Sequence, residues 1–241
     1  MKAHREAQRI HTSVLAAAEK RLLVRVAGRM PAFVNSDHLT TLAGIAMAVA
    51  GACYWIGPGS ATAMLCAIGM LAVNWFGDSL DGTLARVRKH ERPRYGFYVD
   101  HVLDVIGILF LLVGFALGGF MTPLVAVGFL VAYYLLMVEI ALATYAVGEF
   151  RISFWKFGPT ELRILLAIGT LQLLRSPYVT IGGEQFLLFD VGGVVAIVAL
   201  LATFVASATR NGRLLYQQEP LPARQAPAPA LKSLESETWC S

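Results

Sequence analysis

Residues 78–104 read DSLDGTLARVRKHERPRYGFYVDHVLD, and they connect two apolar runs of the chain. The first run, 61–76, ends just before this stretch, and the second, 97–117, begins inside it. A helix needs about 20 mostly apolar residues to cross the hydrocarbon core of a bilayer. The pattern therefore predicts two neighbouring membrane-spanning helices whose ends are joined by a short, basic loop.

Four further apolar runs complete a predicted set of six spans. They cover residues 39–56, 123–147, 162–174 and 188–208. Of the 241 residues, 56% are hydrophobic and 15% are charged, whereas soluble domains average about 45–50% apolar and about 25% charged residues. This composition excludes a disordered chain, a nucleic-acid tail protein and most soluble enzymes. We expect an all-α integral membrane protein with six transmembrane helices, in a catalytic domain over residues 31–210.

Residues 1–30 are predicted to form an amphipathic helix on the cytoplasmic surface of the membrane. Apolar residues recur every four positions and basic residues fill other positions, as in a helix that lies flat on a bilayer. The apolar set is Val14, Ala18, Leu22, Val26 and Met30. A plain solvated helix is the alternative interpretation. The segment is charged and has no apolar core, so we do not expect a signal peptide.

The other end of the chain, residues 211–241, changes in composition. Four prolines stand among Ala, Gln and Glu without any apolar period. Such a segment cannot bury enough apolar surface to offset the entropy of ordering it. We therefore expect a disordered cytoplasmic tail.

The distribution of basic residues predicts the orientation. Nineteen of the 20 Lys and Arg residues fall on one side of the six predicted spans, and Arg175 falls on the other. Cytoplasmic loops attract Lys and Arg, so both termini and residues 78–104 should be cytoplasmic in a multi-pass protein of the cell (inner) membrane. The net charge of +4 then reflects orientation among membrane lipids, and we expect no nucleic-acid partner.

Four of the six aspartates of the chain lie in the quoted stretch. Asp78 and Asp81 are spaced i, i+3, and Asp100 and Asp104 are spaced i, i+4, so each pair should line one face of a helix. The loop between the two helices would bring the four carboxylates together at the membrane boundary. Helix capping or pairing with the basic residues of the loop could explain one or two of these carboxylates, but not paired faces on consecutive helices.

Converging carboxylates repel one another, and divalent cations relieve that repulsion. Ligand sets made only of oxygen suit Mg²⁺ or Mn²⁺, and two ions held by shared carboxylates favour phosphoryl chemistry. We therefore expect a site for two divalent ions.

The pattern of residues 78–104 resembles the signature of the CDP-alcohol phosphotransferases, D-x2-D-G-x2-A-R, a spacer of eight or nine residues, then G-x3-D-x3-D. All eight signature residues are present at permitted spacing. The resemblance implies transfer of a substituted phosphoryl group from a CDP-alcohol, usually CDP-diacylglycerol, to the hydroxyl of a small polar alcohol. CMP is released and the product is a phospholipid. The resemblance also implies six spans with a cytoplasmic site, and members of this family are commonly homodimers.

Roles for the signature residues follow from the same resemblance. The implied metal ligands are Asp78, Asp81, Asp100 and Asp104. Asp104 would also be the base for the attacking hydroxyl. The implied CDP-alcohol contacts are Gly82, Ala85, Arg86 and Gly96. The two glycines could instead be simple helix-packing residues.

A second, looser resemblance concerns residues 35–40, NSDHLT, which are similar to a P-N-x-[LIV]-T start common in the family. These residues could contact the nucleotide, or Ser36 or Asp37 could simply cap the first span.

The expected acceptor contacts lie at the cytoplasmic start of the fifth span. They are Arg151, Lys156 and Arg163. A helix start at Pro159 with nearby cations would suit an anionic acceptor, although the positive-inside rule alone also explains such a loop. Glu139, inside the fourth span, is either functional or a hydrogen-bonding residue between helices.

Two other functions fit parts of the sequence. An ion or divalent-metal transporter would also carry carboxylates in its spans, but the acids gather at one surface and form no ladder across the bilayer. A silent scaffold would require the loss of signature residues, and none is missing.

The orientation can be tested by labelling cysteines with an impermeant reagent. In a background without native cysteines, His90→Cys should resist labelling from outside intact cells, because residue 90 lies in the basic loop. Arg175→Cys, on the opposite side, is the positive control. Ready labelling at position 90 would invert the predicted topology.

Overall fold

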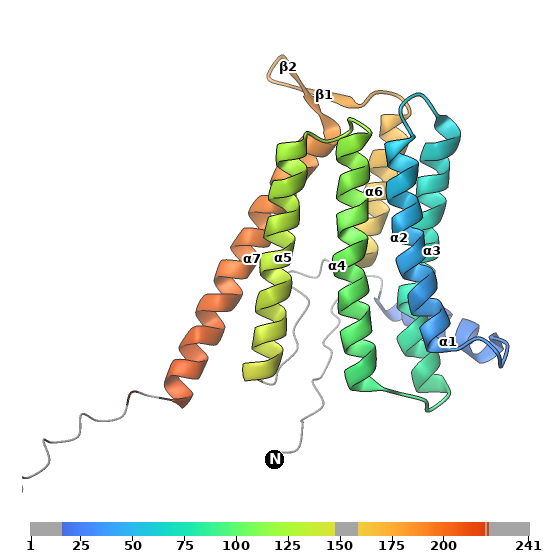
Figure 1. Cartoon of the computed structure of the whole chain (residues 1–241), viewed down its shortest axis with the longest axis vertical. Helices are drawn as coiled ribbons and strands as arrows, with labels where there is room; N and C mark the ends of the chain where they lie inside the picture. The colour runs from blue at the N-terminus through green and yellow to red at the C-terminus, as the bar shows by residue number, and fades with distance from the viewer. Residues whose placement is uncertain (1–15, 148–158, 220, 222–241) are drawn as a thin grey trace, which may run out of the picture.

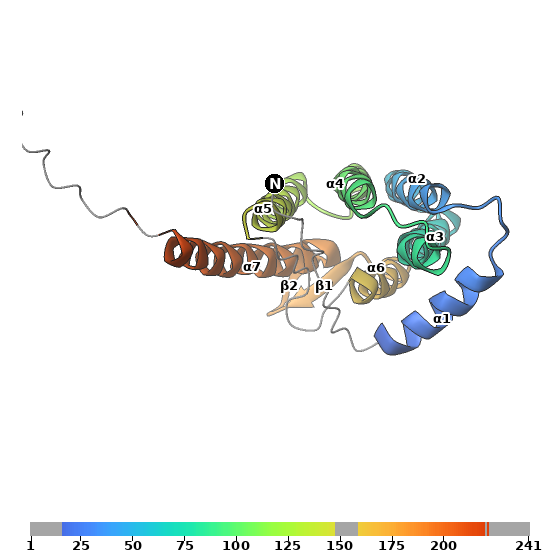
Figure 2. The ribbon, with the colours of Figure 1, turned by 90° about the horizontal axis from the view of Figure 1, so that it is seen from below.

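The computed structural model describes residues 16–147, 159–219 and 221, and within them the chain is almost entirely helical. The helices are α1 (Ala16–Arg29), α2 (Ser36–Trp55), α3 (Ala61–Val87), α4 (Pro93–Leu117), α5 (Pro123–Ala146), α6 (Pro159–Leu173) and α7 (Leu188–Gln218). Helices α2 to α7 run along the long axis, and α1 lies across one end of the bundle (Figures 1 and 2). The predicted all-α membrane fold is confirmed.

Five helices of the described residues are long and apolar enough to cross a membrane, namely α2, α3, α4, α5 and α7. Helix α6 has 15 residues, which at about 1.5 Å per residue fall short of a bilayer core of about 30 Å. However, α5 ends near the α1 end of the bundle and α7 begins at the opposite end (Figure 1). The chain must therefore return across the bundle along α6, and the count of six complete spans stays a prediction.

The N-terminus of α2 is capped by a residue other than the expected ones. The side chain of Asn35 accepts a hydrogen bond from the His38 backbone, and the His38 ring accepts one from the Asn35 backbone N–H. This reciprocal pair satisfies two donors at the helix start. A helix cap is thus present, but Asn35 forms it in place of Ser36 or Asp37.

Helix α7 continues past the expected start of the tail. We predicted disorder from residue 211, whereas the helix extends to Gln218. The amide of Asn211 donates to Glu139 Oε1 on α5 at 2.8 Å, so a contact between helices holds this part of α7 in place. Residues 222–241 of the expected tail lie outside the described residues.

Helix α1 packs on α3 through a face that matches the predicted one only in part. Leu23 and Ala27 are buried in a cluster with Leu80 and Leu84 of α3, whereas Leu22, which we placed on the apolar face, is 51% exposed. Val26 and Met30 border the same cluster, as expected of the apolar face. A repeat of four residues does not match the 3.6 residues per turn of a helix, so successive apolar residues shift around its surface. The row of residues buried against α3 is therefore the neighbouring one, which includes Leu23 and Ala27. Contact of α1 with a membrane surface stays a prediction.

A small hairpin at the far end of the bundle was not predicted. Strands β1 (Tyr178–Ile181) and β2 (Glu184–Leu187) pair antiparallel, with Ile181 opposite Glu184. The two residues between them, Gly182 and Gly183, have φ of 62° and 93°. Positive φ at both turn positions is the requirement of the two-residue turn that matches strand twist, and glycine meets it without strain.

Helix α2 is central to the packing, because its most extensive contacts are with α3 and α4. Its backbone comes very close to α4 at two glycines: a Cβ added to Gly51 or Gly114 would collide with backbone atoms of the other helix. Towards the hairpin end, Tyr54 of α2 packs edge-on against Phe115, Phe120 and Phe189. Small residues and aromatic rings thus fix the spacing of the helices that carry the aspartates.

This packing predicts that Gly114→Ala destabilises the protein. The new methyl group would meet the backbone of Gly51, and overpacking of this kind typically costs about 1–3 kcal/mol. Gly69→Ala in α3 is the matched control, because nothing lies within 4 Å of a Cβ there and alanine favours the helix by about 1 kcal/mol. Thermal unfolding in one detergent compares the two variants. Equal unfolding midpoints would contradict the close α2–α4 contact.

Candidate active site

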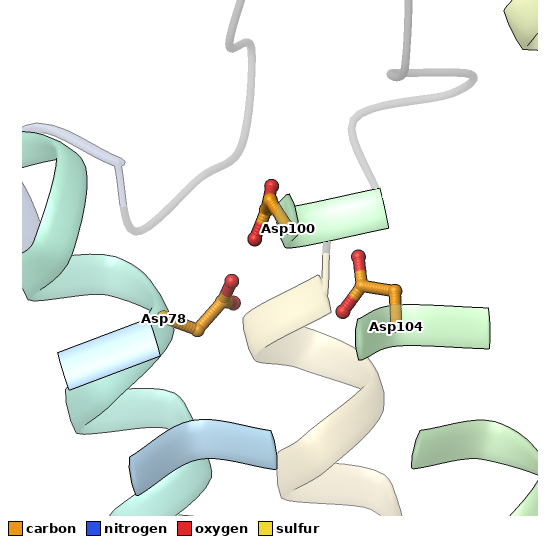
Figure 3. Close-up of side chains that lie close together, drawn as sticks. All are labelled: Asp78, Asp100 and Asp104. Carbon is orange, nitrogen blue, oxygen red and sulfur yellow. The ribbon is translucent and has the colours of Figure 1, made fainter. Parts of the chain in front are cut away.

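Three of the predicted metal ligands meet at the α1 end of the bundle. Asp78 lies on α3, and Asp100 and Asp104 lie one turn apart on α4. One oxygen from each carboxylate lies within 4.8 Å of the others, and Figure 3 shows the three side chains pointing towards a common space. The predicted convergence of the two helices is therefore present for these three residues.

Asp81 lies apart from this group. Its Oδ2 accepts a hydrogen bond from Thr40 Oγ1 of α2 at 2.7 Å, and its backbone carbonyl accepts one from Ser36 Oγ at 3.1 Å. Three residues along a helix rotate a side chain by about 60° relative to the first, which turns Asp81 from Asp78 towards α2. Its role as a metal ligand stays a prediction.

The three clustered carboxylates fit a hard divalent cation. Their donor set is oxygen only, which suits Mg²⁺ or Mn²⁺ better than a soft metal. Asp78 and Asp100 are half-buried and Asp104 is exposed, so the group opens to the surroundings on the α4 side. Without positive charge, three carboxylates this close repel one another.

Arg163 supplies part of that positive charge. Its Nη2 donates to Asp78 Oδ2 at 2.6 Å, and its Nε donates to Asn74 Oδ1 at 2.7 Å. We predicted Arg163 as an acceptor contact, and the structure places it directly beside a predicted metal ligand. The other two predicted acceptor contacts, Arg151 and Lys156, lie outside the described residues.

Two residues near the cluster were missed from sequence. Asn74 lies one turn before Asp78 on α3 and is 5% exposed; a lone amide within an apolar run was the signal that could have identified it. Tyr133 on α5 lies near Asp104, Asp100 and Asp78. No sequence spacing links Tyr133 to the aspartates, because only the packing of α5 brings it there.

A pocket adjoins the end of α3, the helix that carries the first half of the signature. Its volume of about 390 Å³ lies within the usual size range of small-molecule sites. Its lining comes from the start of α2, the end of α3 and the loop before α4: Asn35, Ser36, Asp37, Leu84, Ala85, Arg88, His90, Glu91 and Arg92. One edge is closed by an ion pair between Arg92 and Asp37. This hydrogen-bonded carboxylate raises the pKa of Arg92. Of the four predicted CDP-alcohol contacts, Ala85 is the one in this lining.

Of the other three predicted contacts, the two glycines have room beside them. A Cβ on Gly96 would meet nothing within 4 Å, and one on Gly82 would meet only the Arg86 side chain, at 3.7 Å. In contrast, a Cβ on Gly77 would lie 2.6 Å from the Leu39 carbonyl. Packing between helices therefore explains Gly77 but not Gly82 or Gly96. The Arg86 guanidinium donates to Thr83 Oγ1 at 3.1 Å, along its own helix.

Glu139 takes part in a separate contact between α5 and α7. It is 8% exposed, and its two oxygens accept hydrogen bonds from Ser207 Oγ and Asn211 Nδ2, each at 2.8 Å. This agrees with the interpretation of Glu139 as a hydrogen-bonding residue between helices.

Comparison with known proteins bears on the identity of this site. No curated protein matches the sequence significantly. The model of one family, described as CDP-alcohol phosphatidyltransferase, matches residues 33–207. The match extends from just before α2 to late in α7 and includes the aspartate cluster, the pocket and Arg163. The chain therefore belongs to the CDP-alcohol phosphatidyltransferase family.

Proposed function

We propose that this protein transfers the phosphatidyl group of CDP-diacylglycerol to an acceptor alcohol and releases CMP, in a reaction that depends on Mg²⁺ or Mn²⁺. Membership of the family makes it a membrane transferase of phospholipid synthesis that uses a CDP-alcohol donor. The donor lipid, the metal and the acceptor are our proposals. From the distribution of basic residues, we place the reaction at the cytoplasmic face.

The observation that carries this proposal is the group of three carboxylates on consecutive helices, with oxygens within 4.8 Å of one another. Divalent cations held by Asp78, Asp100 and Asp104, with Asp81 as a further proposed ligand, would neutralise the charge of the donor diphosphate. The family match supports the same assignment, because the matched residues, 33–207, include these four aspartates.

The protein groups have distinct proposed tasks in the transfer. Asp104, the exposed member of the group, accepts the proton of the acceptor hydroxyl. The hydroxyl oxygen then forms a bond to the phosphorus of the phosphatidyl group, while the bond from that phosphorus to CMP breaks. The pocket beside Ala85 suits the cytidine, and the space at Gly82 and Gly96 allows the nucleotide to approach the backbone closely.

We infer that the acceptor carries a negative charge. Arg163, near the start of α6, donates a hydrogen bond to Asp78 of the cluster. A guanidinium forms bonds to phosphate or carboxylate about twice as strong as those between neutral groups. Glycerol phosphate and inositol phosphate fit this requirement better than inositol.

The transporter alternative has less support. Glu139, the buried acidic residue of α5, binds Ser207 and Asn211 of α7 and does not extend the aspartate cluster across the bundle. The three clustered aspartates lie in the halves of α3 and α4 nearer the loop that joins these helices, and their side chains point towards one another (Figure 3).

The proposal predicts CMP release that depends strictly on divalent metal. Purified protein is incubated with labelled CDP-diacylglycerol and, in turn, glycerol 3-phosphate, inositol phosphate, inositol and serine. Release should occur with an anionic acceptor, cease in excess EDTA and return with Mg²⁺ or Mn²⁺, because the carboxylates need the cation to bind the diphosphate. Full turnover after verified metal removal would rule out the metal site. Efficient use of inositol would rule out the anionic acceptor.

Asp104→Asn should separate proton transfer from binding. The amide keeps the shape of the side chain but cannot accept the proton, and loss of a general base typically lowers the rate by about 10²–10⁴. The KM of the CDP-donor should change much less than kcat. Asp190→Asn is the control, because Asp190 binds the backbone of Thr122 at the opposite end of the bundle. A near wild-type rate for Asp104→Asn would exclude Asp104 as the base.

A further inference from the structure

Asn74 is buried in the centre of the bundle and connects three helices. Its Nδ2 donates to the backbone carbonyl of Ala43 on α2 at 3.1 Å, and its Oδ1 accepts from Arg163 Nε on α6 at 2.7 Å. The close approach of α2 to α3 at Gly77, one turn along, brings the Ala43 backbone within reach. Because the amide nitrogen is committed to α2, the amide oxygen must face α6.

The two bonds of Arg163 use one edge of its guanidinium group. Nε donates to Asn74 and Nη2 donates to Asp78, residues that lie one turn apart on α3. Among the residues that the structure describes, these are the two hydrogen bonds that Arg163 makes. A guanidinium carries five N–H donors in a fixed plane, so three remain for a ligand once this edge is occupied.

Burial makes this orientation specific. The Arg163 side chain is 15% exposed and that of Asp78 is 23% exposed. An arginine in such a setting loses most of its rotamer freedom, and a planar fork that is already oriented gives up less entropy when it binds an anion. An arginine beside three carboxylates that lacked these two hydrogen bonds would instead turn its guanidinium group towards the strongest negative charge.

We propose that Asn74 is a positioning residue, which holds one edge of the Arg163 guanidinium on α3 and so directs its remaining donors to the anionic group of the acceptor. This inference rests on the proposed function. Asn74 lies outside the signature, and in this proposal it takes part in selecting the acceptor without contacting either substrate.

The kinetic test compares Asn74→Leu, which keeps the branched shape of the side chain but has no polar atom, with Asn74→Asp, which keeps the oxygen and loses the amide donor. Asn74→Leu should raise the KM for glycerol 3-phosphate or inositol phosphate about ten-fold, the loss expected for one hydrogen bond to a charged group. The KM for CDP-diacylglycerol should stay nearly unchanged. Asn74→Asp should retain most of the acceptor affinity. If Asn74→Asp is as impaired as Asn74→Leu, the acceptor KM does not depend on the oxygen that binds Arg163, and the positioning role is wrong.

A double-variant cycle tests whether Asn74 acts through Arg163. In an Arg163→Ala background, Asn74→Leu should raise the acceptor KM no further, because the group it positions is absent. Additive effects of the two substitutions would overturn the proposal. Thr170→Val is the matched control: Thr170 is a fully buried residue of α6 that bonds the Tyr54 hydroxyl of α2, so its loss should lower stability and leave the acceptor KM unchanged.

The same cycle, read as thermal unfolding midpoints without substrates, tests the contact separately from turnover. Non-additive shifts for Asn74→Leu and Arg163→Ala are expected, because the side chains are hydrogen-bonded. Additive shifts would overturn the contact on which the inference depends. Wild-type protein that released no CMP with any acceptor would overturn the proposed function and the acceptor role together. An active wild type with an unchanged KM in Asn74→Leu would overturn the positioning role alone.

Discussion

The repulsion among Asp78, Asp100 and Asp104 is the constraint on which the rest of the structure depends. Their oxygens lie within 4.8 Å of one another, and like charges at that separation favour moving apart. Two features oppose this. Arg163 binds Asp78 directly, and α2 packs closely against both α3 and α4. The glycines at the α2 contacts allow backbone to lie against backbone, so the helices cannot separate without losing that packing. The bundle therefore holds the carboxylates at a distance that suits a cation.

The two ends of the bundle differ in the kinds of side chain that they carry. At the hairpin end, Tyr54 and three phenylalanines form a dense aromatic cluster, and Tyr54 bonds Thr170 of α6. At the other end, the helices carry acids, cations and a pocket of about 390 Å³. Aromatic packing far from the charges can offset the cost of the polar end.

The sequence predicted the features that depend on local spacing. Six apolar runs correspond to α2–α7, and the aspartates of the signature predicted the cluster, because i, i+4 spacing fixes a helical face. Features set by packing between helices were not accessible. The side chain of Asp81 accepts a hydrogen bond from Thr40, because α2 lies beside that part of α3. Leu23 is buried and Leu22 is not, because Leu23 is the residue that packs on α3. Helix α7 extends beyond residue 210, where Asn211 donates a hydrogen bond to Glu139. The two-glycine hairpin carried a sequence signal in Gly182 and Gly183, but its flanking strands have four residues each and no clear apolar alternation.

Glycine shows most clearly why composition alone cannot assign a role. Gly77 and Gly82 lie five residues apart on α3, yet a Cβ on the first would collide with α2 and one on the second would meet only a flexible side chain. A sequence pattern treats both as small residues suited to helix packing. The structure separates them by what lies opposite: backbone at Gly77, and open space beside the cluster at Gly82. In the proposed reaction, the room that Gly82 leaves next to the clustered carboxylates lets the charged nucleotide approach the helix.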